Sequence, residues 1–327
     1  MRRREFITLL GGAAASWPLA ASAAVGNVAK VGILWHAGSV EEEAVYFAQI
    51  QQGLEALGYV EGRNITLLNT FADEQYERFN RNAAELVRRK VDVLVAVTLP
   101  AALAAQRATN TIPIVFILVS DPVATKLVAS LAHPGGNITG LSPLADELLP
   151  KSLDLFKETV PSLSEIRFMV NPSVPLTTQR SVEEVRTAAQ HLGIPVRPVE
   201  AADPGQIEQA FSSIQDGVSG VMVQADAMFF RERKQIALWG LKRKIPTLVF
   251  NSTMVEDGGL MAYAASRQAM FRRLAAYVDR ILKGANPGEL PVELPTTFEL
   301  DINLKTAKAI GQTISPAILN LADKVIE

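Results

Sequence analysis

Polar side chains able to bind a small molecule follow apolar runs at several points of this chain. Runs such as Val93–Val97 and Ile114–Val119 are apolar throughout, which is typical of strands covered on both faces. Carboxylate, hydroxyl, amide and imidazole groups at strand ends can form hydrogen bonds and ion pairs with a polar ligand. The candidate binding residues are His36, Thr98, Ser120, Asp121, Asn171, Asp226 and Asn251.

Thr98 has the surroundings of a carboxylate-binding residue. It lies just before a predicted helix that begins at Pro100 or Ala101. The free backbone N–H groups and the dipole at a helix N-terminus, together with a hydroxyl, suit a carboxylate. The same hydroxyl could simply cap the helix, and the two roles are compatible.

Asp121 and Asp226 are acids placed after apolar strands, and either could pair with a ligand ammonium through charge-assisted hydrogen bonds. Asp121 is followed by Pro122, a pattern that also caps helices. Asp226 has no proline after it and precedes Met228 and Phe229. Asp226 is therefore the better candidate, and a capping role stays open for Asp121.

Amide and aromatic groups complete the candidate set. Asn171 and Asn251 can hydrogen-bond to a zwitterion or hold their own loops through Asx turns. Trp35 and His36 end the first predicted strand. An aromatic ring there could stack on a planar ligand, but we expect Trp35 to pack in the core and His36 to reach the ligand.

Groups for catalysis are few. The chain has no cysteine and three histidines, His36, His133 and His191. None of the common hydrolase, metalloprotease or nucleotide-binding motifs occurs. We therefore predict no catalytic residue, no metal site and no cofactor. An exported hydrolase that uses two carboxylates facing each other across a cleft stays as an alternative.

The elements that must position these residues alternate along the chain. From Lys30 onward, short apolar runs alternate with amphipathic helical segments, which predicts α/β lobes with doubly wound parallel sheets. Ser39 and Glu42 form a predicted capping box, and residues 122–131 are a predicted helix.

Turn sequences at residues 133–137 and 257–259 break this alternation. We therefore predict two lobes joined by a hinge. Lobe 1 comprises residues 24–142 plus 257–292, and lobe 2 comprises residues 143–256 plus 293–327. Ligands bind at the carboxyl ends of parallel strands and in clefts between domains, so we expect the binding site between the lobes.

Residues 1–23 have the three parts of a signal peptide. Arg2, Arg3 and Arg4 precede an apolar stretch of roughly ten residues, and Ala21-Ser22-Ala23 provides a small-x-small end. Arg3-Arg4 followed by x-Phe-Ile is similar to a twin-arginine signal. A spanning helix needs about 20 apolar residues, and Pro18 interrupts this run. We predict export to the periplasm by the twin-arginine route.

The charge of the chain excludes one class of partner. Removing the leader takes away three arginines and one glutamate, so the formal net charge of −2 becomes about −4. Nucleic-acid binding requires a basic patch, and the mature chain has none. We predict no nucleic-acid partner.

Several short motifs in a fixed order resemble one family. They are Ile112–Phe116, Ser120–Pro122, Leu127–Leu131, Pro134–Gly140, Asn171-Pro172, Phe229-Phe230, Gly258–Tyr263 and Phe298–Ala309. Together they resemble the ABC-transporter substrate-binding proteins typified by tryptophan- and tyrosine-binding proteins. The similarity covers essentially the whole mature chain. It implies two lobes of the type I periplasmic-binding class, in agreement with the alternation of elements.

The resemblance implies capture of a small solute and its delivery to an ABC permease in the inner membrane. The expected ligand is an amino acid, with an aromatic one as a candidate, bound by a monomer that closes on its hinge. In this mechanism lobe 1 holds the ligand carboxylate near Thr98, and lobe 2 supplies Asp226 and Asn251. A periplasmic sensor that docks on a membrane receptor uses the same closure and stays as an alternative.

Overall fold

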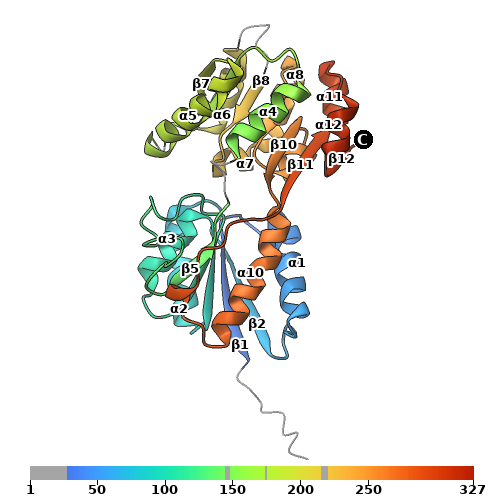
Figure 1. Cartoon of the computed structure of the whole chain (residues 1–327). Helices are drawn as coiled ribbons and strands as arrows, with labels where there is room; N and C mark the ends of the chain where they lie inside the picture. Colours follow the sequence, from blue (N-terminus) through green and yellow to red (C-terminus); the bar gives the residue numbers. More distant parts are fainter. Residues whose placement is uncertain (1–27, 144–147, 174, 215–219) are drawn as a thin grey trace, which may run out of the picture.

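The computed structural model describes residues 28–143, 148–173, 175–214 and 220–327, which form two lobes stacked end to end (Figure 1). The predicted signal peptide lies outside the described residues. None of the helices described is long and apolar enough to cross a membrane.

Lobe 1 is built on a five-stranded parallel sheet with the strand order β2-β1-β3-β4-β5. Helices α1 and α10 contribute to the apolar cluster on one face of this sheet, and α2 and α3 to the cluster on the other. The strands are β1 (Ala29–Trp35), β2 (Ile65–Phe71), β3 (Val93–Val97), β4 (Ile114–Ile117) and β5 (Ile138–Leu141), and the helices are α1 (Val40–Ala56), α2 (Tyr76–Arg88), α3 (Leu99–Ala108) and α10 (Arg267–Leu282).

Lobe 2 is built on a seven-stranded sheet with the order β12-β11-β10-β9-β8-β6-β7. Its pairs are parallel except for β10 and β11. The strands are β6 (Ile166–Val170), β7 (Val196–Glu200), β8 (Gly220–Val223), β9 (Thr247–Val249), β10 (Met261–Ala265), β11 (Phe298–Asn303) and β12 (Lys324–Ile326). The helices are α4 (Leu149–Thr159), α5 (Pro175–Ala189), α6 (Pro204–Ser212), α7 (Ala227–Arg231), α8 (Arg233–Arg243), α9 (Ser252–Glu256), α11 (Leu304–Ile310) and α12 (Pro316–Leu321).

The predicted fold class is confirmed, and one segment lies in a different lobe from the one expected. The sequence predicts residues 257–292 in lobe 1. Residues 261–265 of this segment instead form β10, which pairs with β9 and β11 of the sheet of lobe 2. The chain therefore crosses at Ser266, and α10 packs on lobe 1. Two further crossings lie between β5 and α4 and before β11 (Figure 1).

Backbone hydrogen bonds tie the crossing segments together. The Ser142 N–H donates to the Glu293 carbonyl over 3.0 Å, and the Glu293 N–H donates to the Gly140 carbonyl over 2.9 Å. The Ser266 N–H donates to the Thr297 carbonyl over 3.0 Å. The hinge therefore consists of the crossing segments, which are joined to one another by backbone hydrogen bonds.

Two local predictions are wrong. Residues 122–131 form turns and bends with no helix; the N–H groups of Leu127 and Val128 both donate to the Pro122 carbonyl, and Lys126 takes a φ of 58°. A helix cannot continue through such a left-handed residue. At α1, Ser39 is the N-cap but makes no side-chain capping hydrogen bond.

Candidate ligand-binding site

The two lobes meet in side-chain contacts at the carboxyl ends of their parallel strands. The hydroxyl groups of Tyr46 on α1 and Thr253 on α9 lie 3.2 Å apart. Asp121, after β4, pairs with Arg180 on α5. These contacts join elements of different lobes, so the structure has its lobes in contact across the predicted binding cleft.

His36 lies at the end of β1 between two carboxylates. Its Nδ1 atom is 2.6 Å from Glu74 Oε1, and its Nε2 atom is 3.2 Å from Glu43 Oε1. Burial raises the pKa of Glu43, because the low-dielectric interior penalises its charge. The His36 ring centroid also lies 6.3 Å from that of Phe230, in lobe 2.

Asp226 is a partly buried carboxylate with no ion-pair partner among the described residues. It caps α7, where its Oδ1 atom accepts from the N–H groups of Met228 and Phe229 over 2.9 and 3.2 Å. Its Oδ2 atom accepts from Asn171 Nδ2 over 3.2 Å. Burial raises the pKa of Asp226, and the charge of Glu74 in the other lobe adds to the rise. The site therefore offers negative charge to a cation.

The two predicted asparagines are both buried at strand ends, and they differ in how their amides are satisfied. Asn171 accepts from the Ser173 N–H over 3.0 Å and donates to Asp226. Asn251 caps α9 by accepting from the Met254 N–H over 3.0 Å. Its Nδ2 group is buried and has no hydrogen-bond partner within the described chain, which costs about 1–3 kcal/mol unless a partner is supplied.

Thr98 combines an open helix end with a strained backbone. It is the N-cap of α3 at a φ of 78° and makes no side-chain capping hydrogen bond, so the expected hydroxyl cap is not formed. The first turn of a helix leaves backbone N–H groups without intrahelical partners. A β-branched residue at positive φ is costly, and such residues cluster at functional sites.

Ser120 and Asp121 lie together after β4. Ser120 is exposed, and its carbonyl accepts from Ser142 Oγ over 3.0 Å. Burial alone raises the pKa of Asp121, but the hydrogen bond from the Ala124 N–H and the pairing with Arg180 outweigh it and lower the pKa. Asp121 is therefore already paired with Arg180 of lobe 2.

Four residues that the sequence analysis missed complete the contact region: Glu74, Phe230, Phe250 and Arg267. The Arg267 guanidinium carbon lies 5.2 Å from the Phe230 ring centroid and 5.9 Å from that of Phe250, a cation–π arrangement. Glu74 shortly follows the strand β2, so the same strand-end rule could have found it. Trp35 is 1% exposed and stacks on Phe271, as expected of a core residue.

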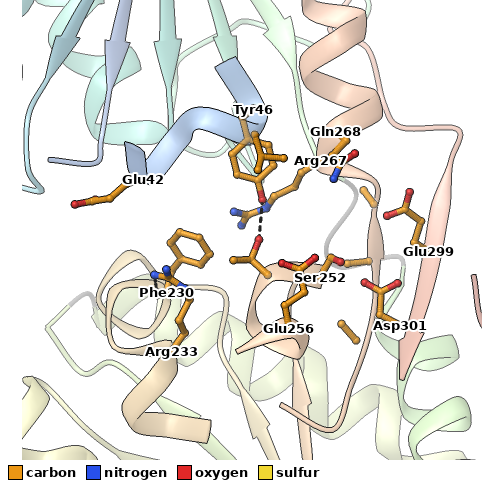
Figure 2. A pocket seen from close by; sticks show the side chains of 15 residues that line it. Glu42, Tyr46, Phe230, Arg233, Ser252, Glu256, Arg267, Gln268, Glu299 and Asp301 are labelled. Atoms are coloured by element: carbon orange, nitrogen blue, oxygen red, sulfur yellow. Dashed lines mark hydrogen bonds between the residues drawn. The ribbon is translucent and has the colours of Figure 1, made fainter. Parts of the chain in front are cut away.

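A pocket of about 150 Å³ opens beside these residues, between α1 of lobe 1 and α9, β10 and β11 of lobe 2 (Figure 2). Tyr46, Phe230 and Arg267 line it together with residues of β10 and β11. Among the described residues, no group of three or more His, Asp or Glu side chains could hold a metal ion. The arrangement offers hydrogen bonds, aromatic faces and charge to a small organic molecule.

Comparisons with known proteins find a matching family and similar relatives. Residues 37–326 match the family described as "ABC transporter substrate binding protein". A tyrosine-binding protein of Clostridioides difficile (strain R20291) is 27% identical over 259 residues, covering 79% of this chain and 74% of the relative.

Two solved structures are similar over nearly the whole chain. A conserved domain protein from Vibrio cholerae is 28% identical, with a TM-score of 0.83 over 91% of this chain and 99% of that one. The ABC domain from Streptococcus pneumoniae, solved in complex with L-Trp, is 25% identical, with a TM-score of 0.82 over the same shares.

Proposed function

Because the chain belongs to the ABC transporter substrate-binding protein family, we propose that it captures an amino acid between its two lobes and delivers it to an ABC permease. The amino-acid ligand is supported by the relatives that are named for tyrosine binding and solved with L-Trp. An aromatic side chain is a candidate on the same ground.

The observation that carries the proposal is the partly buried carboxylate of Asp226 at the contact between the lobes, which accepts hydrogen bonds but has no ion-pair partner among the described residues. A ligand ammonium placed there would neutralise it and lower its raised pKa. Glu74 lies close enough to act on Asp226 from the opposite lobe. The attraction for a cation therefore increases as the lobes approach.

The ligand carboxylate goes to the opposite wall in this proposal. The N-terminus of α3 supplies backbone N–H groups and the positive end of a helix dipole. The Thr98 hydroxyl, which makes no capping bond, adds a further donor. From lobe 2, the same lobe as Asp226, Asn251 Nδ2 is a further donor that a ligand oxygen can satisfy.

Closure of the lobes follows from these contacts. A ligand that touches both lobes binds the closed form preferentially and shifts the population toward it. The closed form is then the one that the permease recognises. The predicted signal peptide places this capture in the periplasm, after export by the twin-arginine route.

Calorimetric titration tests the proposal. The protein from Ala24 onward is unfolded, dialysed free of ligand, refolded and titrated with each of the twenty amino acids. We expect at least one to bind with 1:1 stoichiometry. Failure of every amino acid to bind would contradict the ligand class, and turnover of a bound compound would contradict a purely binding role.

A further inference from the structure

The floor of the pocket is formed by side chains of β10 and β11, and the pairing of these two strands determines which side chains face it. In the antiparallel pair β10–β11, Ala262 lies opposite Asp301 and Ala264 lies opposite Glu299. Side chains alternate between the two faces of a strand, so these four residues share one face, and all four line the pocket. Two alanines opposite two acids leave space above the sheet.

The two faces of β11 differ in polarity, because the face opposite the pocket is apolar. Leu300 and Ile302 of β11 point to the other face and belong to the apolar core of lobe 2. Asp301 is itself only 2% exposed. A carboxylate at such a position is costly unless it is paired or hydrogen-bonded.

Charges around the pocket are not balanced. Asp301 is hydrogen-bonded by Ser252, but within the described ranges neither it nor Glu299 forms an ion pair. Lys324 lies beside Asp301 in the register and pairs with Glu256. Burial raises the pKa of Asp301 and the charge of Glu299 adds to the rise, while the Ser252 hydrogen bond and the charge of Lys324 offset part of it.

Two arginines line the pocket together with four acids, Glu42, Glu256, Glu299 and Asp301. Arg233 pairs with Asp257 over 2.6 Å, and Arg267 lies over the rings of Phe230 and Phe250. The acids therefore outnumber the arginines in the lining, and Asp301 and Glu299 place negative charge at the floor. Figure 2 shows their carboxylates on the lobe 2 side of the pocket, below Gln268 and Arg267.

The size and position of the pocket suit one end of an amino acid. About 150 Å³ is the volume of roughly five water molecules, enough for the end of a straight side chain. Phe230 and Arg267 border the pocket and also contact the cleft residues His36 and Phe250. The pocket therefore shares two lining residues with the contact region between the lobes, and within the described residues no group of three or more His, Asp or Glu side chains could hold a metal ion.

We propose that this pocket receives a second cationic group, the ammonium or guanidinium at the end of the ligand side chain, with Asp301 and Glu299 as its acceptors. The ligand class is then the basic amino acids. This inference rests on the proposed function and narrows it. The α-carboxylate and α-ammonium keep the contacts near Thr98 and Asp226.

The test compares side chains that differ only in charge. Ligand-free protein is titrated with L-lysine, L-ornithine and L-arginine, with L-norleucine as the neutral analogue of lysine, and with L-tryptophan and L-tyrosine. We expect the best basic amino acid to bind at least tenfold more tightly than L-norleucine, since an unpaired buried charge gains a partner. Basic amino acids that bind no better than L-norleucine would overturn the inference.

Variants of the pocket separate this inference from the proposed function. Glu299→Gln, at the half-buried rim, and Asp301→Asn should each lower the preference for lysine over norleucine about tenfold. Ala264→Leu should fill the pocket and exclude the long side chains. Glu208→Gln, an exposed acid of lobe 2, removes the same charge outside the pocket and should change nothing.

Three further outcomes would contradict the pocket inference. If tryptophan or tyrosine binds and the basic amino acids do not, the pocket inference is wrong and the proposed function stands. If the preference for lysine survives both Glu299→Gln and Asp301→Asn in folded protein, the acceptors are wrong. If no amino acid binds, the proposed function fails and the inference falls with it.

Discussion

The hydroxyl of Tyr46 lies 3.2 Å from the hydroxyl of Thr253, so a hydrogen bond joins α1 of one lobe to α9 of the other. A hydrogen bond between lobes exists only when they are in contact, so it stabilises the closed form selectively. Tyr46 also stacks on Phe271 within lobe 1 at a centroid distance of 4.8 Å, which holds its ring in place without the hydroxyl.

Tyr46→Phe should weaken ligand binding while leaving the ring packing intact. The lost hydrogen bond is worth about 1 kcal/mol, so the dissociation constant should rise about fivefold. Tyr59→Phe is the matched control, because the Tyr59 hydroxyl donates to Asp279 within lobe 1. Calorimetry should show an affinity change for the first variant only; equal affinity in both would contradict a role for this contact in closure.

Asp226→Asn should abolish most of the ligand affinity without removing the helix cap. Asparagine caps helices as well as aspartate does, so the change is one of charge. Losing the partner of a buried charge costs about 2 kcal/mol or more, or roughly thirtyfold in affinity. Asp203→Asn, at the N-cap of α6, should leave affinity unchanged. Undiminished binding by Asp226→Asn would remove that residue from the site.

The free energy of unfolding should depend on pH through the protonation of Asp226. Burial raises the pKa of Asp226 in the free folded protein. Its protonation therefore contributes stability that is fully present below the unfolded-state pKa and is lost as the pH rises through the folded-state pKa. Urea unfolding should show Asp226→Asn gaining stability over the parent at neutral pH, with the gain vanishing near pH 3.

Binding should have the opposite pH dependence. The ionised carboxylate holds the ligand ammonium, so affinity should fall as the pH drops through the raised pKa of Asp226. Asp226→Asn should lack this component of the pH profile. The same pH slope in both proteins would assign the titration to another group.

Thr98→Gly should separate stability from binding. Glycine adopts positive φ readily, so the substitution at a φ of 78° should stabilise the free protein by about 1 kcal/mol. Loss of the hydroxyl should weaken the affinity for the ligand. Lys244→Gly, at the C-cap of α8 with a φ of 53°, should stabilise the protein without changing affinity. Unaltered binding by Thr98→Gly would show that the hydroxyl makes no ligand contact.

The export route can be tested on the leader alone. Replacing Arg3 and Arg4 with lysine should retain the protein in the cytoplasm if export uses the twin-arginine pathway, because an ordinary signal tolerates either base. Cell fractionation followed by immunoblotting measures this. Continued appearance in the periplasm would assign the leader to the general secretory route.

The fold was predictable in part because two inner strands of lobe 1 are continuous apolar runs. The runs at β3 and β4 are apolar throughout and lie in the sheet as expected. The lobe of β10 was not predictable, because strand partners are set by packing between distant segments rather than by local pattern. Its Met261 pairs with Leu248 of β9 and Ile302 of β11, far apart in the chain.

The site was predictable only as a set of strand ends. Three residues selected as strand ends, His36, Asn171 and Asp226, lie at or near the contact between the lobes. The strand-end rule missed Arg267, which begins a helix after a lobe crossing, because no local pattern shows where a crossing leads. It also gave no sign that Asp121 pairs with Arg180, since ion pairs between lobes depend on closure.

A crystal structure of the protein with its bound amino acid shows where the ligand lies and which groups hold it. We expect one ligand between the lobes, with its carboxylate within hydrogen-bond distance of Thr98 and the first turn of α3. Its ammonium should lie within hydrogen-bond distance of the Asp226 carboxylate. A ligand bound outside the interlobe cleft, or one whose ammonium contacts neither Asp226 nor Glu74, would contradict the proposed capture of an amino acid between the lobes.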